Sequence, residues 1–187
     1  LAGRAHPYES GNPAVMRPVL DQLQEAGIET LIVTNAAGSL KTSIPPGSLM
    51  LLTDHINYSG MNPLIGQHGD ENFVPMTDAY DPALRKRFLA AAKKAKLVLK
   101  QGVYVWFSGP SFETPAEIKM AQIMGGSAVG MSTVPETIMA RRLGLKVAGL
   151  SVITNLGAGI KGASPSHEET KREGQKAAAN MKRLLTR

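Results

Sequence analysis

Short apolar runs alternate with helical segments along this 187-residue chain, and that alternation restricts its fold more than any other feature. Runs rich in branched apolar residues predict strands at 28–34, 47–56, 102–109, 127–132 and 146–154. Apolar residues at helical spacing predict helices at 13–26, 82–96, 115–124, 134–143 and 167–185. The pattern is typical of an α/β domain with a largely parallel or mixed central sheet.

Several helix ends carry their own signals. Thr114 with Glu117, and Ser166 with Glu169, fit the capping box that begins a helix, and Gly27 is a natural stop for the first helix. The segment 57–76 has no clear period and is too long for a routine connection. Long ordered loops of this kind are often lids or interface arms.

Composition narrows the class of protein. With 43% hydrophobic residues, residues 1–187 fit one domain with its own core. The absence of cysteine excludes disulfides, thiolate metal sites and a thiol nucleophile, and agrees with a reducing compartment. There is no apolar run of the roughly 18 residues that a membrane span needs, and no signal-peptide pattern. Because Leu1 is not an initiator methionine, we expect the sequence to begin partway through a longer protein.

The chain is basic, with 21 basic and 15 acidic residues and a net charge of +6, which suits nucleic acid or an anionic small substrate. The densest basic run, residues 81–100, reads as an amphipathic helix with a solvated charged face. It has no interleaved aromatic residues, and no nucleic-acid motif is present. We therefore expect no nucleic-acid partner.

Small and polar residues follow four of the predicted strands, in "VTNAAGS", "FSGPSFET", "VGMSTVPE" and "VITNLGAG". Open α/β sheets place ligands at the carboxyl ends of their strands, where small residues let backbone N–H groups approach closely. One such stretch after a strand is an ordinary turn, whereas four of them indicate a common cleft. Ser132 precedes a predicted helix and is either its cap or a contact for an anion.

Near the start, "GRAHPYE" places Arg4, His6 and Tyr8 at alternate positions. If the segment is extended, the three side chains point to one face. Arginine can hold phosphate with two donors and histidine can shuttle protons. The alternative is an exposed edge strand.

"GRAHPYE", "VTNAAGSL", "GPSFETPAE", "AVGMSTVPE" and "ITN", in that order, closely resemble the trimeric, low-molecular-mass class of purine nucleoside phosphorylase. The resemblance runs from Gly3 through the helix after His167. It implies a mixed sheet forming a distorted barrel surrounded by helices, and a homotrimer. It also implies a cytoplasmic enzyme of purine salvage that cleaves purine (2′-deoxy)ribonucleosides with phosphate. Inorganic phosphate is then a co-substrate and no cofactor is expected.

The resemblance also implies roles for individual residues. Arg4, His6, Ser132 and the backbone N–H of Ala36 match phosphate-binding positions. The ribose-contacting positions are matched by Tyr8, Met131 and His167.

On the purine side, the matching positions are Phe112, Glu113, Val129 and Asn155. Glu113 would accept N1–H of a 6-oxopurine, and Asn155 would meet O6 and N7. We expect Asn155 to be the central catalytic residue, with Glu113 and His6 beside it. Adenine has no N1 proton, so hypoxanthine and guanine should be preferred.

Two departures from the family pattern limit the comparison. The family's N-terminal part, with a glycine-rich phosphate loop and a serine, has no counterpart before Leu1. In the 57–76 loop, trimeric members bring a phenylalanine into the neighbouring subunit's site, and Phe73 is the nearest candidate.

Other classes of function remain open. A nucleoside hydrolase would need clustered aspartates for calcium, which are lacking, and the four histidines show no ligand spacing, so no metal site is expected. A methylthioadenosine phosphorylase would carry aspartate at position 155. A nucleoside-binding protein without catalysis is the third alternative.

Overall fold

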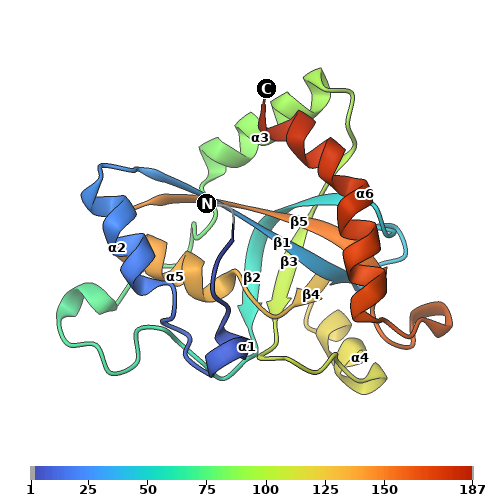
Figure 1. Ribbon diagram of the computed structural model, residues 1–187, viewed down its shortest axis with the longest axis horizontal. Helices are drawn as coiled ribbons and strands as arrows, with labels where there is room; N and C mark the ends of the chain where they lie inside the picture. The colour runs from blue at the N-terminus through green and yellow to red at the C-terminus, as the bar shows by residue number, and fades with distance from the viewer. Residues whose placement is uncertain (1–2, 187) are drawn as a thin grey trace.

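Five strands close into a mixed barrel in the computed structural model, which describes residues 3–186 and, of residues 169 and 171, only the backbone (Figure 1). The strands are β1 (Thr30–Ser39), β2 (Leu49–Asn57), β3 (Leu99–Trp106), β4 (Ala128–Gly130) and β5 (Lys146–Leu156). Around the barrel the order is β1-β4-β3-β2-β5. The pairs β1–β5, β2–β3 and β3–β4 are parallel, and β1–β4 and β2–β5 are antiparallel. The expected α/β fold with a mixed barrel is confirmed.

Burial on both faces explains the continuous apolar runs of the strands. Residues Leu49 to Leu52 of β2 are all buried, with alternate side chains belonging to two different core clusters. One cluster includes Met50, Tyr104 and Trp106, and the other packs β2 against α3 and α6. A strand covered on both sides loses the polar alternation of a half-exposed strand.

Helices surround the barrel (Figure 1). They are α1 (Pro7–Ser10), α2 (Arg17–Glu25), α3 (Pro82–Lys94), α4 (Pro115–Ile123), α5 (Val134–Arg142) and α6 (His167–Leu185), with 3₁₀ turns η1 (Asp70–Asn72) and η2 (Ile160–Gly162). The first predicted helix begins four residues late, at Arg17, because Pro18 lacks an N–H and is tolerated only in a first turn. Gly27 ends it as expected: φ is +78°, and the N–H of Ile28 donates to the carbonyl of Leu23 at 3.0 Å.

The capping box before α4 is confirmed. The N–H of Thr114 donates to Glu117 Oε2 at 2.7 Å, and the N–H of Glu117 donates to Thr114 Oγ1 at 3.2 Å. The second predicted box depends on the side chain of Glu169, which lies outside the described residues. No helix in residues 3–186 is long and apolar enough to cross a membrane.

Strand β1 is longer than predicted. The small residues from Asn35 to Ser39 do not form a turn; they continue the strand, pairing with β5 throughout and with β4 at Gly38 and Ser39. The register with β5 shifts between Ala37 and Gly38, where β1 gains its second partner. Small side chains fit this crowded stretch of wall, and the ladder bonds outweigh the low strand propensity of alanine and glycine.

The segment that begins at Arg4 is not extended throughout, and it is not an edge strand. His6 has extended dihedral angles (φ −119°, ψ 146°), but α1 then begins at Pro7 and ends at Ser10, before Gly11, whose φ is +72°. Proline fixes a helical φ at the first position, which turns the chain before Tyr8. The rings of His6 and Tyr8 nevertheless stack, with centroids 4.8 Å apart.

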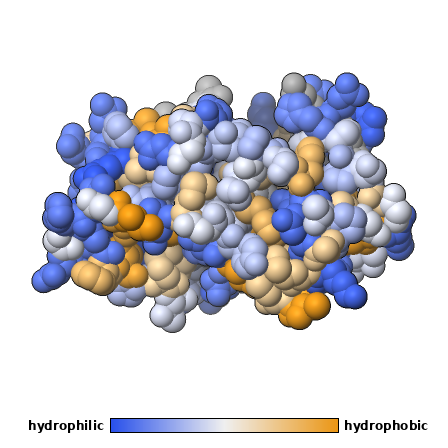
Figure 2. All heavy atoms as spheres, turned by 90° about the horizontal axis from the view of Figure 1, so that it is seen from below, coloured by the Kyte–Doolittle hydropathy of each residue, from blue (hydrophilic) through white to orange (hydrophobic). Residues whose placement is uncertain are grey.

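The 57–76 segment starts at Asn57, the last residue of β2, and the rest of it has one short 3₁₀ turn, η1, and no strand. Phe73, directly after this turn, is 86% exposed. Figure 2 shows the lower face of the molecule, where hydrophobic groups are interrupted by hydrophilic ones. That face therefore presents no single continuous apolar patch.

Candidate active site

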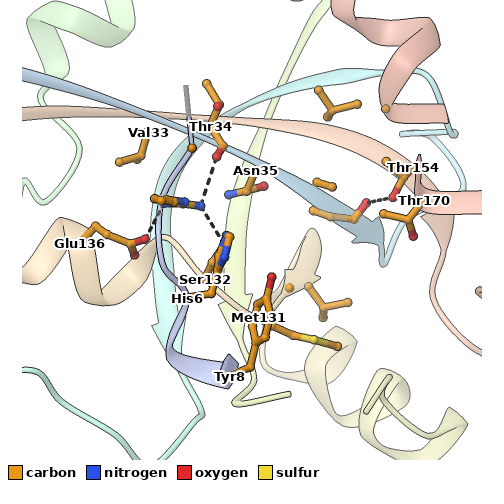
Figure 3. A pocket seen from close by; sticks show the side chains of 18 of the residues that line it. His6, Tyr8, Val33, Thr34, Asn35, Met131, Ser132, Glu136, Thr154 and Thr170 are labelled. Carbon is orange, nitrogen blue, oxygen red and sulfur yellow. Dashed lines mark hydrogen bonds and ion pairs between the residues drawn. The ribbon is translucent and has the colours of Figure 1, made fainter. Parts of the chain in front are cut away.

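A cavity of about 1080 Å³ lies between the N-terminal segment, β1, β4, the ends of β5 and α5, and the inner side of α6 (Figure 3). All but one of the site residues predicted from the sequence line it. These are Arg4, His6, Tyr8, Ala36, Phe112, Glu113, Val129, Met131, Ser132, Asn155 and His167. Phe73 does not line the cavity. The structure thus brings together side chains that are up to 163 residues apart.

Arg4 is the cation of this cavity. Its Nη2 donates to Ser132 Oγ at 3.0 Å and to the carbonyl of Thr34 at 3.2 Å, and its Nη1 donates to Glu136 Oε1 at 2.6 Å. The Arg4 side chain is 16% exposed. A guanidinium held against a serine hydroxyl is a good site for a tetrahedral oxyanion.

The turn into α5 places Ser132. Thr133, the residue before the helix, has φ +77° and ψ −45°, and the N–H of Val134 donates to the carbonyl of Ser132 at 2.9 Å. This is a γ-turn of the positive-φ kind, which is rare and strained, above all for a β-branched residue. Strain of this sort persists where its surroundings enforce it, often at functional sites. Here Thr133 is fully buried, and its hydroxyl accepts from Asn35 Nδ2 at 2.8 Å.

His6, Tyr8, Met131 and Ser132 all line the cavity (Figure 3), and the rings of His6 and Tyr8 stack. Nδ1 of His6 pairs with Glu9 Oε1 at 2.8 Å, leaving Nε2 for another partner. Burial, and then the nearby Glu9 carboxylate, raise the pKa of Tyr8, so its phenol stays a neutral hydrogen-bonding group. These side chains offer a polar edge and a soft apolar wall to one ligand.

Glu113 and Asn155 form a second polar area. Glu113 is buried, burial raises the pKa of its carboxyl, and Oε1 has no hydrogen-bond partner among residues 3–186. Nδ2 of Asn155 donates to the carbonyl of Leu156 at 2.9 Å, and Oδ1 accepts from Thr154 Oγ1 at 2.9 Å. Each of these two Asn155 atoms keeps one further hydrogen-bonding position. The pair can therefore match a ligand edge that has both donors and acceptors.

The sequence profile of the phosphorylase superfamily matches residues 9–187. Purine nucleoside phosphorylase 1 of Geobacillus stearothermophilus is 43% identical over 99% of this chain and 69% of its own length. The chain belongs to the purine nucleoside phosphorylase family. The resemblance found from the motifs is confirmed.

Solved structures of the family agree with this assignment. Schistosoma purine nucleoside phosphorylase with hypoxanthine superposes with a TM-score of 0.92, at 35% identity, over 98% of this chain and 69% of that one. The Schistosoma mansoni enzyme with adenosine gives the same values. This chain is accordingly a purine nucleoside phosphorylase, an enzyme that transfers a pentosyl group.

The remaining predicted residues stand at the rim and wall of the phosphorylase cavity. Phe112 is 40% exposed and Val129 is buried, while His167 is the first residue of α6. Gly109, with φ +67°, is pressed against Met131, because a Cβ there would lie 2.5 Å from Met131 Sδ. A larger residue at position 109 would displace this side chain.

Sequence reasoning missed Glu136, Thr133, Asn35 and Thr154, which surround the predicted residues of this phosphorylase. Only Glu136 belongs to a recognisable local pattern, because it follows Thr133 by three residues. That spacing predicts a capping box and not a contact with Arg4. Within residues 3–186 no group of three or more acidic or histidine side chains could hold a metal ion.

Proposed function

We propose that the enzyme cleaves 6-oxopurine (2′-deoxy)ribonucleosides, such as inosine and guanosine, with inorganic phosphate. The products are the free base and (deoxy)ribose 1-phosphate. The observation that carries this proposal is the pairing of a buried, incompletely bonded carboxyl, Glu113, with an amide, Asn155, that has one donor and one acceptor position left. This combination complements N1–H, O6 and N7 of a 6-oxopurine.

Phosphate would bind at Arg4 and Ser132, with the backbone N–H of Ala36 and His6 completing the site. The Arg4–Ser132 contact of 3.0 Å supports a shared oxyanion between the two groups. Charge-assisted hydrogen bonds hold the anion firmly, and its position next to the sugar supplies most of its activation. One phosphate oxygen forms the bond to C1′ as the bond from C1′ to N9 breaks.

The electron pair of the broken bond passes to the purine. N7 would take up a proton from water, and Asn155 would donate to O6 and accept from N7–H, so that negative charge does not accumulate on the leaving base. Glu113 would hold N1–H, and Phe112 and Val129 would lie against the ring. Asn155 touches the departing group and is the catalytic residue of this proposal.

Tyr8, Met131 and His167 would contact the ribose. We also propose a homotrimer in which Phe73 reaches the site of the neighbouring subunit. Its 86% exposure, away from the cavity of its own chain, supports this role. We expect no metal or organic cofactor in the reaction, and treatment of the enzyme with EDTA should leave the rate unchanged.

Adenosine tests the base preference most directly. The Schistosoma mansoni enzyme has been crystallised with adenosine, so binding alone is a poor measure of preference. The 6-amino group would place a donor opposite Asn155 Nδ2 and leave Glu113 without a proton to accept. Sites built around such hydrogen bonds discriminate by factors of about 10⁴, and we expect the difference in kcat/KM.

The deciding experiment follows hypoxanthine release from inosine with and without phosphate, with adenosine in parallel. Release that requires phosphate, from inosine far faster than adenine from adenosine, is the expected result. Equal release without phosphate would identify a hydrolase. Binding of purine without turnover would identify a binding protein, and adenosine cleaved as fast as inosine would disprove the proposed roles of Glu113 and Asn155.

A further inference from the structure

Glu136 makes the shortest contact of Arg4. Its Oε1 lies 2.6 Å from Arg4 Nη1, although 132 residues separate the two in the sequence. The Glu136 side chain is 3% exposed, and its other oxygen, Oε2, has no hydrogen-bond partner among the described residues. Burying a carboxylate with one oxygen unmatched opposes folding. A buried residue that lowers the stability of the fold is better explained by a role in the active site than by a role in folding.

Helix capping does not explain Glu136. It occupies the third position of α5, where an acidic residue commonly bonds back to the N–H of the capping residue. Glu117 does this at the same position of α4, where it accepts from the N–H of Thr114. At the start of α5 there is no side-chain cap hydrogen bond, and Glu136 turns instead to Arg4.

The contacts of Arg4 show what Glu136 controls. Nη2 has three neutral acceptors, the carbonyl of Thr34 and the hydroxyls of Ser132 and Thr133, at 3.0 to 3.3 Å. Nη2 carries two protons, so these acceptors compete and do not define one orientation by themselves. Glu136 is the charged acceptor, at the other end of the guanidinium (Figure 3). Its charge-assisted bond fixes the orientation of the guanidinium.

The γ-turn at Thr133 gives a second, independent reason. A β-branched residue at φ +77° is held there by its surroundings, and its hydroxyl bonds both Asn35 and Arg4. The turn brings the first turn of α5, and so Glu136, against the arginine. The strained Thr133 and the unpaired Oε2 of Glu136 thus lie within four residues of each other, and both residues contact Arg4.

We propose that Glu136 is a positioning residue for phosphate binding, acting through Arg4. By occupying Nη1, it determines which guanidinium N–H groups remain for the anion and where they point. The inference rests on the proposed function, in which Arg4 and Ser132 hold phosphate. It predicts that a change at Glu136 affects phosphate and leaves the nucleoside largely unaffected.

The test compares three substitutions in the full protein, with steady-state kinetics varied separately in phosphate and in inosine. Glu136→Ala removes the acceptor, and Glu136→Asp keeps the charge but shortens its reach by one methylene. Both should raise the KM for phosphate by about tenfold, with the KM for inosine changed less than about twofold. Glu136→Gln keeps an oxygen acceptor at the original reach but loses the charge, so it should raise the KM for phosphate by a smaller factor, about threefold.

Asp21→Asn is the matched control, because Asp21 pairs with Arg17 at 3.5 Å on α2. It should change neither KM. Equal rises in both KM values, or Asp and Gln variants that behave alike, would overturn the inference. If the alanine variant does not fold, the comparison of Asp with Gln decides. If the wild-type enzyme needs no phosphate, the proposed function itself is refuted. If the wild type depends on phosphate but the variants have an unchanged KM for phosphate, only the role of Glu136 is refuted.

Discussion

Gly38 links the unexpected length of β1 to the base side of the cavity. A Cβ at this position would lie 3.0 Å from Asn155 Nδ2 and 3.3 Å from Val129 Cγ2. Both neighbours belong to the proposed purine site, and both contacts are tighter than nine in ten of those that Cβ atoms make. We therefore predict that Gly38→Ala lowers catalysis in a protein that still folds.

The magnitude follows from the size of the displacement. The methyl group forces Asn155 or Val129 to move by a few tenths of an ångström. A shift of 1 Å at a reacting group can lower the rate by about 100-fold, so kcat/KM for inosine should fall by roughly three- to tenfold. Overpacking costs about 1–3 kcal/mol, and the loss of glycine's backbone freedom offsets about 0.5–1 kcal/mol of it. The free energy of unfolding should thus fall by at most about 2.5 kcal/mol.

The assay measures kcat/KM for inosine at saturating phosphate, together with the thermal unfolding midpoint. Gly149→Ala is the control, since its Cβ would crowd Leu52 and Tyr80 at 2.9 and 3.0 Å and neither lines the cavity. It should lower the midpoint with kcat/KM nearly unchanged. A Gly38→Ala enzyme with wild-type kcat/KM would refute the argument, as would an equal loss of activity in the control.

Three further predictions follow from the site and its surroundings. Because burial raises the pKa of Glu113, its carboxylate becomes protonated at a higher pH than that of an ordinary glutamate. The protonated form cannot accept N1–H, so kcat/KM for inosine should begin to fall at that higher pH. The same shift means that stability declines as pH rises through the raised pKa. Glu113→Gln should therefore flatten this dependence, increase stability at neutral pH and reduce inosine cleavage; unchanged pH profiles of rate and unfolding would contradict this. Thr114→Ala removes the capping box with Glu117 and should cost about 1 kcal/mol, or about 2–4 °C in the unfolding midpoint, whereas an unchanged midpoint would show the box to be dispensable. Phe73→Ala should leave unfolding within about 0.5 kcal/mol, since the ring is exposed, but should raise the KM for inosine if it serves a neighbouring subunit.

Local patterns predicted the elements of this fold well, because each depends on nearby residues. The apolar run at Leu49 to Leu52 and the capping residues around Thr114 determine a strand and a helix start without help from distant parts of the chain. The strand β1 was predicted to end at residue 34, whereas Asn35 to Ser39 continue it. These residues have low strand propensity, and only pairing with β4 and β5 makes them a strand.

The candidate site was predicted mainly through the resemblance of motifs, and the roles of its residues stay predictions. The structure adds that these residues share one cavity. Neither Glu136 nor the strained Thr133 could be found from the sequence: a positive φ at threonine has no sequence signal, and the bond from Glu136 to Arg4 spans 132 residues. Such contacts depend on how the barrel closes.

The parallel pairing of β1 with β5 also has a consequence for how the protein is made. About 116 residues separate Thr30 from its partner Lys146, so β1 is synthesised long before the strand that completes it. At roughly 5–20 residues per second, the ribosome takes about 6–23 s to cover this interval, during which Ile32 and Val33 have no β5 to pair with. The nascent chain should therefore stay protease-sensitive until β5 has emerged, and chains stopped before Lys146 should be digested faster than chains that include Leu156.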